Sequence, residues 1–280
     1  MSQLTVSWRD NILKIRGRRL PGGAVDLQYL EAYCRGGSTN RPWDQTVIGH
    51  ATELLSAGAD GSELKLRCTL ADGVTVDHAI TASADEIDFR LAVHNPTRAE
   101  SQAQWAQPCV RVDRFTGSAA HHDRYAYIRK CFIFLDGRLT RLPTPQWATE
   151  ALYTPGQVWG APGVPRTDLN PRPLSPLAPS NGLIGCFSAD ERMILAMAWQ
   201  PYQELFQGVV GCIHSDFRIG RLAAGKTKRI RGKIYLVEND VSALLERYAA
   251  DFPEHDAAHS NILKNVRMSG RPRKAEAATR

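Results

Sequence analysis

Short strand-like runs separated by turn signals dominate the first half of the chain. In residues 87–93, Ile-Asp-Phe-Arg-Leu-Ala-Val, the large apolar residues recur at every second position. This is the period of a strand with one buried and one polar face. Similar runs cover residues 63–70, 74–82 and 86–94, with turn signals such as Ala71-Asp72-Gly73 between them. The spacing predicts an antiparallel meander.

The strand pattern returns after residue 180 and gives way to a helix near residue 240. Strand-like runs cover residues 182–188, 192–199, 206–214, 217–222 and 227–237. Asp240 can cap a helix whose apolar stripe is formed by Leu244, Leu245 and Tyr248. We therefore expect a second set of strands followed by a single C-terminal helix.

Residues 142–180 interrupt the strand pattern, because nine of the sixteen prolines lie there together with Trp147, Tyr153 and Trp159. Proline at this density excludes a central strand or a long helix. The aromatic residues favour an ordered loop packed across a sheet over a disordered linker. Such a loop is either a functional lid or a plain structural cover.

Composition and charge exclude several classes of protein. An apolar fraction of 43% and a charged fraction of 23% are ordinary for a soluble globule. No apolar run reaches the roughly 18 residues that span a bilayer, and the N-terminus carries charges where a signal peptide is apolar. We expect a cytoplasmic protein with no membrane partner.

The net charge of +6 is concentrated in residues 218–233 and 264–280. Neither segment interleaves aromatic and basic residues as a nucleic-acid platform does, so we expect no nucleic-acid partner. The first segment is interpreted as a solvated hairpin and the second as a disordered tail. The predicted organisation is one domain over residues 1–254 and a basic tail over residues 255–280.

Six cysteines are scattered singly, without CxxC spacing. Several lie inside apolar runs, which favours buried free thiols. Their even number leaves three disulfides as the alternative.

A polar face is predicted along residues 103–117, which read as a strand. By strand parity Trp105, Gln107, Cys109, Arg111 and Asp113 lie on one side, and Ala106, Pro108, Val110 and Val112 lie on the other. A Trp, a Gln and an Arg in register suit a polar ligand. An amphipathic strand whose Trp and Arg stack in a wet crevice explains the pattern equally well.

Polar residues cluster again over 199–207 and 212–216. If the chain turns between these runs, Glu204 and His214 meet and can act as a general acid–base pair. His214 and Asp216 share a strand face, so they could orient one another or hold a divalent cation. Two ligands are too few to specify a metal site, and the sequence requires no cofactor.

A third polar cluster, His121-His122-Asp123-Arg124-Tyr125, offers donors and acceptors that suit sugar hydroxyls. Paired histidines in a loop are more often simply solvated. The motifs GxGxxG, GxxxxGK[ST], HExxH and GxSxG are all missing from the sequence, which argues against nucleotide and protease chemistry.

The chain resembles the galactose mutarotase-like superfamily over about residues 20 to 240. The resemblance rests on the succession of strands, on the run at residues 88–97, and on the run at residues 220–227 followed by Arg231-Gly232-Lys233-Ile234. The resemblance implies a β-supersandwich whose concave face binds carbohydrate in aldose epimerases, polysaccharide lyases and accessory domains of glycosidases. In the epimerases a Glu is the base and a His the acid. Glu204 and His214 match by type, but the order of His before Glu is not reproduced.

We therefore expect an all-β, large antiparallel β-supersandwich of the galactose mutarotase-like kind, with a Pro-rich lid loop and a C-terminal helix. The favoured function is a carbohydrate-active enzyme that acts on a sugar or sugar acid by acid–base proton transfer, as an epimerase or lyase. Glu204 and His214 would move protons. The residues expected to contact the substrate are Trp105, Trp199, Gln107, Arg111, His122, Arg124, Gln203 and Asp216.

Two other functions remain open. One is a carbohydrate-binding protein without catalysis, and the other is a structural sandwich that assembles through its aromatic loop. A Glu and a His within reach of one hydroxyl would favour the enzyme, whereas aromatic residues alone would favour binding, and a structural sandwich predicts no polar pocket.

Overall fold

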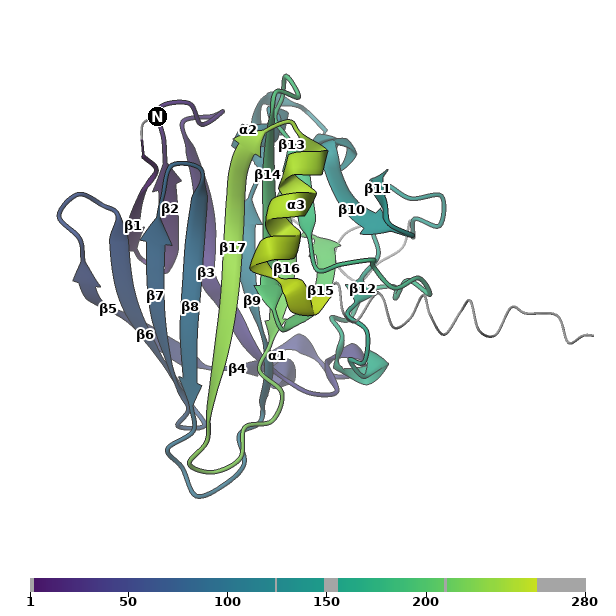
Figure 1. Ribbon diagram of the computed structural model, residues 1–280. Coiled ribbons are helices and arrows are strands. Elements are labelled where there is room, and N and C mark those ends of the chain that lie inside the picture. Colours follow the sequence, from purple (N-terminus) through teal and green to yellow (C-terminus); the bar gives the residue numbers. More distant parts are fainter. Residues whose placement is uncertain (1–2, 124, 149–155, 209–210, 256–280) are drawn as a thin grey trace, which may run out of the picture. The chain divides into compact units, whose positions relative to one another are not determined.

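The computed structural model describes residues 3–123, 125–148, 156–208 and 211–255 (Figure 1). Contacts divide the chain into two compact units, Met1–Asp240 and Val241–Arg280. The first unit holds two antiparallel sheets, and the second holds the helix α3 (Val241–Asp251). Among the described helices, none has the length and apolar character needed to cross a membrane.

The nine-stranded sheet has the order β11-β10-β13-β14-β17-β8-β7-β6-β5. Its strands β5 to β8 are successive antiparallel neighbours, which confirms the predicted meander (Figure 1). The bounds are β5 (His50–Ala57), β6 (Glu63–Leu70), β7 (Thr75–Ala82), β8 (Glu86–His94), β10 (Cys131–Leu135), β11 (Arg138–Arg141), β13 (Ile184–Phe187), β14 (Met193–Gln200) and β17 (Thr227–Glu238).

The eight-stranded sheet has the order β1-β2-β3-β9-β16-β15-β12, with β4 paired to β3. The bounds are β1 (Thr5–Arg9), β2 (Ile12–Arg16), β3 (Ala24–Arg35), β4 (Val47–Ile48), β9 (Ala103–Arg111), β12 (Trp159–Gly160), β15 (Tyr202–Gln207) and β16 (Cys212–Arg218). Short helical turns lie between strands: α1 (Trp43–Thr46), α2 (Asp113–Thr116), η1 (Ser38–Asn40), η2 (Ser118–Ala120), η3 (Ala126–Lys130) and η4 (Arg166–Asp168).

The core lies between the two sheets. Trp199 of β14 packs against Phe89 of β8 and Phe217 of β16, with ring centroids 5.2 and 4.8 Å apart. These rings join the nine-stranded sheet to the eight-stranded sheet, and alternate residues of the other strands complete the apolar layer. The predicted all-β antiparallel sandwich with a C-terminal helix is confirmed.

Three predicted strands differ in extent from the observed ones. The strand predicted over residues 206–214 contains a turn, because β15 ends at Gln207 and β16 begins at Cys212. Gly208 follows β15, and Gly211 adopts a φ of 65° that suits glycine. The run at residues 217–222 is strand only as far as Arg218, and the strand predicted from residue 103 ends at Arg111.

The Pro-rich segment is ordered where it is described, and part of it lies over the outer face of β15 in the eight-stranded sheet. Its strand β12 pairs with β15, and Val158 and Leu169 pack on Phe206. We call residues 156–174 the covering segment. Residues 149–155 and the tail at 256–280 lie outside the described residues. All six cysteines are buried, and no disulfide joins them, as expected.

Candidate functional site

The polar face predicted for β9 points away from the core, toward the covering segment. Ala106 and Val110 belong to the core between the sheets, whereas Trp105 packs outside it with Ala32 and Cys34. Strand parity therefore places Gln107, Cys109 and Arg111 outward as well. Cys212 of β16 lies opposite Arg111, so alternate residues of β16, including His214, Asp216 and Arg218, share this outer face.

Two carboxylates meet on this face beneath the covering segment. Glu204 of β15 is the cross-strand partner of Asp216 of β16, and both are 0% exposed. The backbone N–H of Asn170 donates to Glu204 Oε2 at 2.9 Å. Burial first, and then the charge of Asp216, raise the pKa of Glu204 well above its ordinary value. Burial also raises the pKa of Asp216 to about 7, although His214 opposes this.

His214 completes this group, which we call the acid cluster (Glu204, Asp216 and His214). Its Nδ1 lies 3.6 Å from Asp216 Oδ1, and its ring stacks on Phe206 at 4.3 Å. Burial lowers the pKa of His214, but the neighbouring Cys212 and Asp216 outweigh burial and raise it to about 10. Glu204 and His214 share the outer face of the sheet, and His214 is only 1% exposed.

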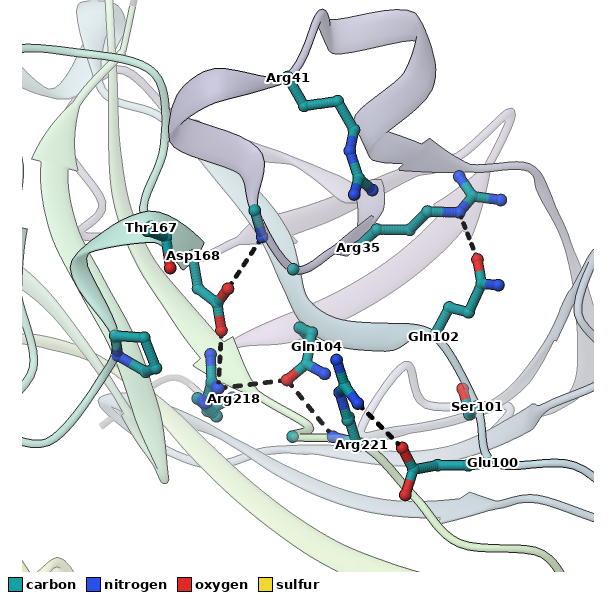
Figure 2. Close-up of a pocket in the computed structure, with 14 residues that line it drawn as sticks. Arg35, Arg41, Glu100, Ser101, Gln102, Gln104, Thr167, Asp168, Arg218 and Arg221 are labelled. Carbon is teal, nitrogen blue, oxygen red and sulfur yellow. Dashed lines mark hydrogen bonds and ion pairs between the residues drawn. The ribbon is translucent and has the colours of Figure 1, made fainter.

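An open pocket of about 850 Å³ lies on the same side of the sheet (Figure 2). We call it the arginine pocket, because four arginines and only two carboxylates line it. The lining side chains include Arg35, Arg41, Arg218, Arg221, Glu100, Asp168, Gln102 and Gln104. Figure 2 shows these side chains converging from four separate parts of the chain, residues 35–41, 100–104, 165–168 and 218–221.

Both carboxylates of the arginine pocket are already paired. Arg218 donates to Asp168 Oδ2 at 3.0 Å, and Arg221 lies 3.4 Å from Glu100. Arg35 donates to Gln102 Oε1 at 2.8 Å and to the carbonyl of residue 47 at 2.7 Å, so its partners are neutral. Within the described residues, neither Arg35 nor Arg41 forms an ion pair with a carboxylate. The pocket therefore has two arginine charges that no carboxylate balances.

The arginine pocket adjoins the acid cluster without containing it. Arg218 follows Asp216 by two positions on β16, and Gln203 directly precedes Glu204. Gln203 accepts a hydrogen bond from Arg218 at 2.9 Å and donates to the carbonyl oxygen of Asp168 at 2.8 Å. Residues 168–170 of the covering segment therefore separate the open pocket from Glu204.

Several predicted contact residues lie elsewhere or are already engaged. The prediction for Trp199 as a sugar platform is wrong, because its ring is buried in the core between the sheets. Trp105 faces outward but is fully buried, with the ring of Trp43 6.3 Å away. Gln107 donates to Glu31 at 3.0 Å, and Arg111 donates to Gln28 at 3.1 Å.

The loop cluster around residue 122 is not part of the buried site. His122 is exposed between η2 and η3, and Arg124 lies outside the described residues. The sequence analysis missed Arg35 at the end of β3, Arg41 directly after η1, and Asp168 of η4. Arg218 could have been found, because it continues the parity of His214 and Asp216 along β16.

No protein-family model and no curated protein match the chain. Solved structures do match at low identity. One, provisionally assigned as an aldose 1-epimerase of Escherichia coli K12, is 11% identical, with a TM-score of 0.45 over 84% of this chain and 99% of the other. A protein from Synechocystis sp. PCC 6803 is 7% identical, with a TM-score of 0.43 over 85% and 96%.

A galactose mutarotase-like protein from Clostridium acetobutylicum is 8% identical, with a TM-score of 0.42 over 83% of this chain and 94% of the other. The loose resemblance to galactose mutarotase-like proteins expected from the sequence is therefore found among solved structures. Alignments this loose transfer neither a substrate nor residue roles to the present chain.

Proposed function

We propose that this protein binds a small sugar acid in the arginine pocket. The observation that supports this most directly is the pair Arg35 and Arg41, which line the pocket without a carboxylate partner among the described residues. A guanidinium group binds a carboxylate through charge-assisted hydrogen bonds, which are stronger than hydrogen bonds between neutral groups. An anionic ligand would supply the missing partner.

The remaining lining favours a ligand with several hydroxyl groups. Gln102, Gln104 and Thr167 present amide and hydroxyl groups at the pocket, and Asp168 and Glu100 add acceptors. Such a mixture of donors and acceptors suits a polyhydroxylated ring. The volume of about 850 Å³ lies within the usual range for sites that take a small molecule. We place this function in the cytoplasm, where the buried thiols would remain reduced.

A second candidate function is proton transfer on the bound sugar acid, as in an epimerase or lyase. It is favoured by Glu204, which lies one residue from Gln203 at the border of the pocket and whose pKa is raised by burial. A carboxyl group whose pKa is raised by burial keeps its proton at a pH where an exposed carboxyl group has lost it, which suits general acid–base work. Residues 168–170 would have to move away from Glu204 before a substrate could reach it.

In this reaction a base removes the proton from the carbon next to the substrate carboxylate, and the electron pair moves into that carboxylate. Return of a proton to the opposite face gives the epimer. Departure of a substituent from the neighbouring carbon gives an unsaturated acid instead. Both outcomes begin with the same loss of a carbon-bound proton, so one measurement tests both.

Binding is tested by isothermal titration calorimetry with glucuronate and galacturonate, and with glucose, galactose and glucose 6-phosphate for comparison. We expect the two acids to bind and the neutral sugars to bind at least about tenfold more weakly. Arg41→Gln should weaken the binding of the acids by about ten- to a hundredfold. Arg19→Gln removes the same charge at an exposed position outside the pocket and should leave affinity unchanged.

Equal binding of acids and neutral sugars would overturn the proposal, as would unchanged affinity in Arg41→Gln. Tighter binding of glucose 6-phosphate than of the two acids would mean that the pocket recognises a phosphate group and not a carboxylate. Turnover is tested by NMR in D₂O, where the native chain, unlike Glu204→Gln, should remove the proton from the carbon next to the carboxylate. An epimerase replaces that proton with deuterium, whereas a lyase gives the signals of an unsaturated acid. Binding with neither change would favour the non-catalytic carbohydrate-binding protein.

A further inference from the structure

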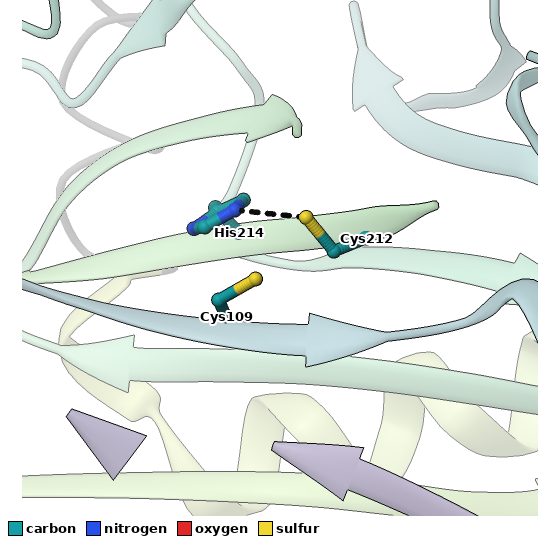
Figure 3. A group of neighbouring side chains, drawn as sticks. All are labelled: Cys109, Cys212 and His214. Carbon is teal, nitrogen blue, oxygen red and sulfur yellow. Dashed lines mark hydrogen bonds between the residues drawn. The ribbon is translucent and has the colours of Figure 1, made fainter. Parts of the chain in front are cut away.

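Three potential metal ligands converge on the outer face of the eight-stranded sheet, away from the lining of the arginine pocket (Figure 3). Cys109 comes from β9, and Cys212 and His214 come from the neighbouring strand β16. One ligand atom of each residue lies within 4.8 Å of the other two, and all three side chains are buried. Figure 3 shows both sulfur atoms and the imidazole edge turned toward a common space.

We propose that Cys109, Cys212 and His214 bind a thiophilic divalent cation, with Zn²⁺ as the ion that fits best. Two sulfur ligands and one imidazole are a donor set that zinc takes in proteins, with a fourth position left for water or another group. Cation sites for Mg²⁺ or Ca²⁺ use oxygen ligands instead. The sequence alone offered only His214 and Asp216 for a cation, and the fold adds the two sulfurs.

The orientation of His214 supports this assignment. Its Nε2 lies 3.3 Å from Cys212 Sγ, and its Nδ1 lies 3.6 Å from Asp216 Oδ1. A metal-bound imidazole usually donates its other N–H to a carboxylate, which fixes the ring. Within the described residues, both oxygens of the buried Asp216 carboxylate and the Nδ1 of His214 have no hydrogen-bond partner. Asp216 would therefore be the residue that orients the metal-binding histidine.

The backbone near Cys212 leaves room that only glycine allows. A Cβ atom at position 208 would lie 2.1 Å from Cys212 Sγ and 2.9 Å from His214 Nε2. The hydroxyl of Tyr127 donates to the carbonyl oxygen of Gly208 at 2.6 Å and holds that backbone in place. The space beside the sulfur and the imidazole is therefore set by Gly208 and would be filled by alanine.

Charge balance also permits a metal at this buried position. Two cysteines that bind as thiolates offset the two positive charges of Zn²⁺, and the imidazole binds in its neutral form, so the ion and its three ligands together carry no net charge. A buried site that gains no net charge avoids the large cost of an unpaired ion in the protein interior. This proposal is independent of sugar binding, because none of the three ligands lines the arginine pocket.

The full chain is purified under reducing conditions, treated with a chelator and titrated with Co²⁺, whose thiolate complexes have a charge-transfer absorption that reports the ligands. We expect one equivalent of Co²⁺ to give this band and Zn²⁺ to displace it. Cys109→Ser and Cys212→Ser should each lose most of the band. Cys186→Ser, which alters a buried cysteine of β13 outside the group, should retain it.

Two measurements keep the proposal testable if a cysteine variant does not fold. Zn²⁺ should raise the melting temperature of the chelator-treated native chain, whereas Mg²⁺ should not. Gly208→Ala should weaken Zn²⁺ binding at least tenfold although it removes no ligand. A native chain without the band and without a melting shift would overturn the proposal. The proposal would also be overturned if mass spectrometry found a disulfide between Cys109 and Cys212 in protein that was kept under reducing conditions and treated with the metal.

Discussion

His78 should make the stability of the fold sensitive to mild acid. It lies on β7 and is 2% exposed, and its ring joins the two sheets through tyrosines of β3. Its Nδ1 is 2.8 Å from the hydroxyl of Tyr29, and its Nε2 is 3.3 Å from that of Tyr33. Burial lowers the pKa of His78 to about 3, although the charge of Asp77 opposes this. The folded state therefore keeps this imidazole neutral.

The sign and size of the effect follow from the difference between the two states. Above a pH of about 6.5 the imidazole is neutral in both the folded and the unfolded chain, and its contribution is complete. As the pH falls from 6.5 toward 3, the unfolded chain takes up a proton and the folded chain does not. The free energy of unfolding then falls by about 1.4 kcal/mol per pH unit, on the order of 5 kcal/mol in all. This is a large part of the stability of an ordinary domain.

The measurement is urea unfolding followed by circular dichroism between pH 7.5 and 4.5, for the native chain and for His78→Gln. Glutamine keeps a polar group near the tyrosines and cannot take up the proton. Carboxylates such as Asp77 titrate in both proteins, so their effect cancels in the difference. We expect the native chain to lose stability more steeply than the variant below pH 6. Parallel slopes would refute the argument that the folded state excludes the proton.

Three further outcomes follow from packing and charge. Trp199→Ala should lower the free energy of unfolding by about 3–5 kcal/mol and leave the affinity for the sugar acid, measured by calorimetry, unchanged. A loss of affinity without a loss of stability would indicate that Trp199 contacts the ligand. Gly232→Ala should lower the urea midpoint more than Gly49→Ala, because a Cβ at residue 232 would lie 2.3 Å from the Trp199 ring, whereas one at residue 49 would make only an ordinary contact at 3.9 Å. Raising the salt concentration from ~0.1 M to ~1 M should weaken sugar-acid binding several-fold by screening the arginine pocket, and an unchanged affinity would contradict an ionic contact.

The sequence predicts the fold best where only one face of a strand is buried. In β6, β7 and β8 the buried and more exposed positions alternate, and their bounds follow the apolar period closely. Strands β15 and β16 are buried on both faces, because the covering segment lies over their outer side. Alternation is then lost, and the turn between them cannot be seen from periodicity.

The candidate site shows the same limit. Parity along β9 and β16 predicts which residues share the outer face, since it depends only on neighbours within a strand. It does not reveal that the chain passes from the nine-stranded to the eight-stranded sheet between Gln200 and Tyr202, which separates Trp199 from Gln203. Nor does it bring Arg35, Asp168 and Arg218 together, because they are far apart in the sequence and meet only through sheet order and the covering segment.

Strand β16 presents metal ligands, a buried carboxylate and a ligand-binding arginine in a row along one face. Cys212, His214, Asp216 and Arg218 recur at every second position, so consecutive members are about 7 Å apart along the strand. The covering segment encloses the first three and leaves Arg218 17% exposed at the open pocket. A charge that appears beside Arg218 can be balanced by water, by Asp168 or by a ligand. A charge that appears at His214 or Asp216 must be balanced by groups already inside the fold. A metal ion that displaces protons from its ligands therefore fits at this buried position, whereas an anionic sugar fits in the open pocket beside Arg218.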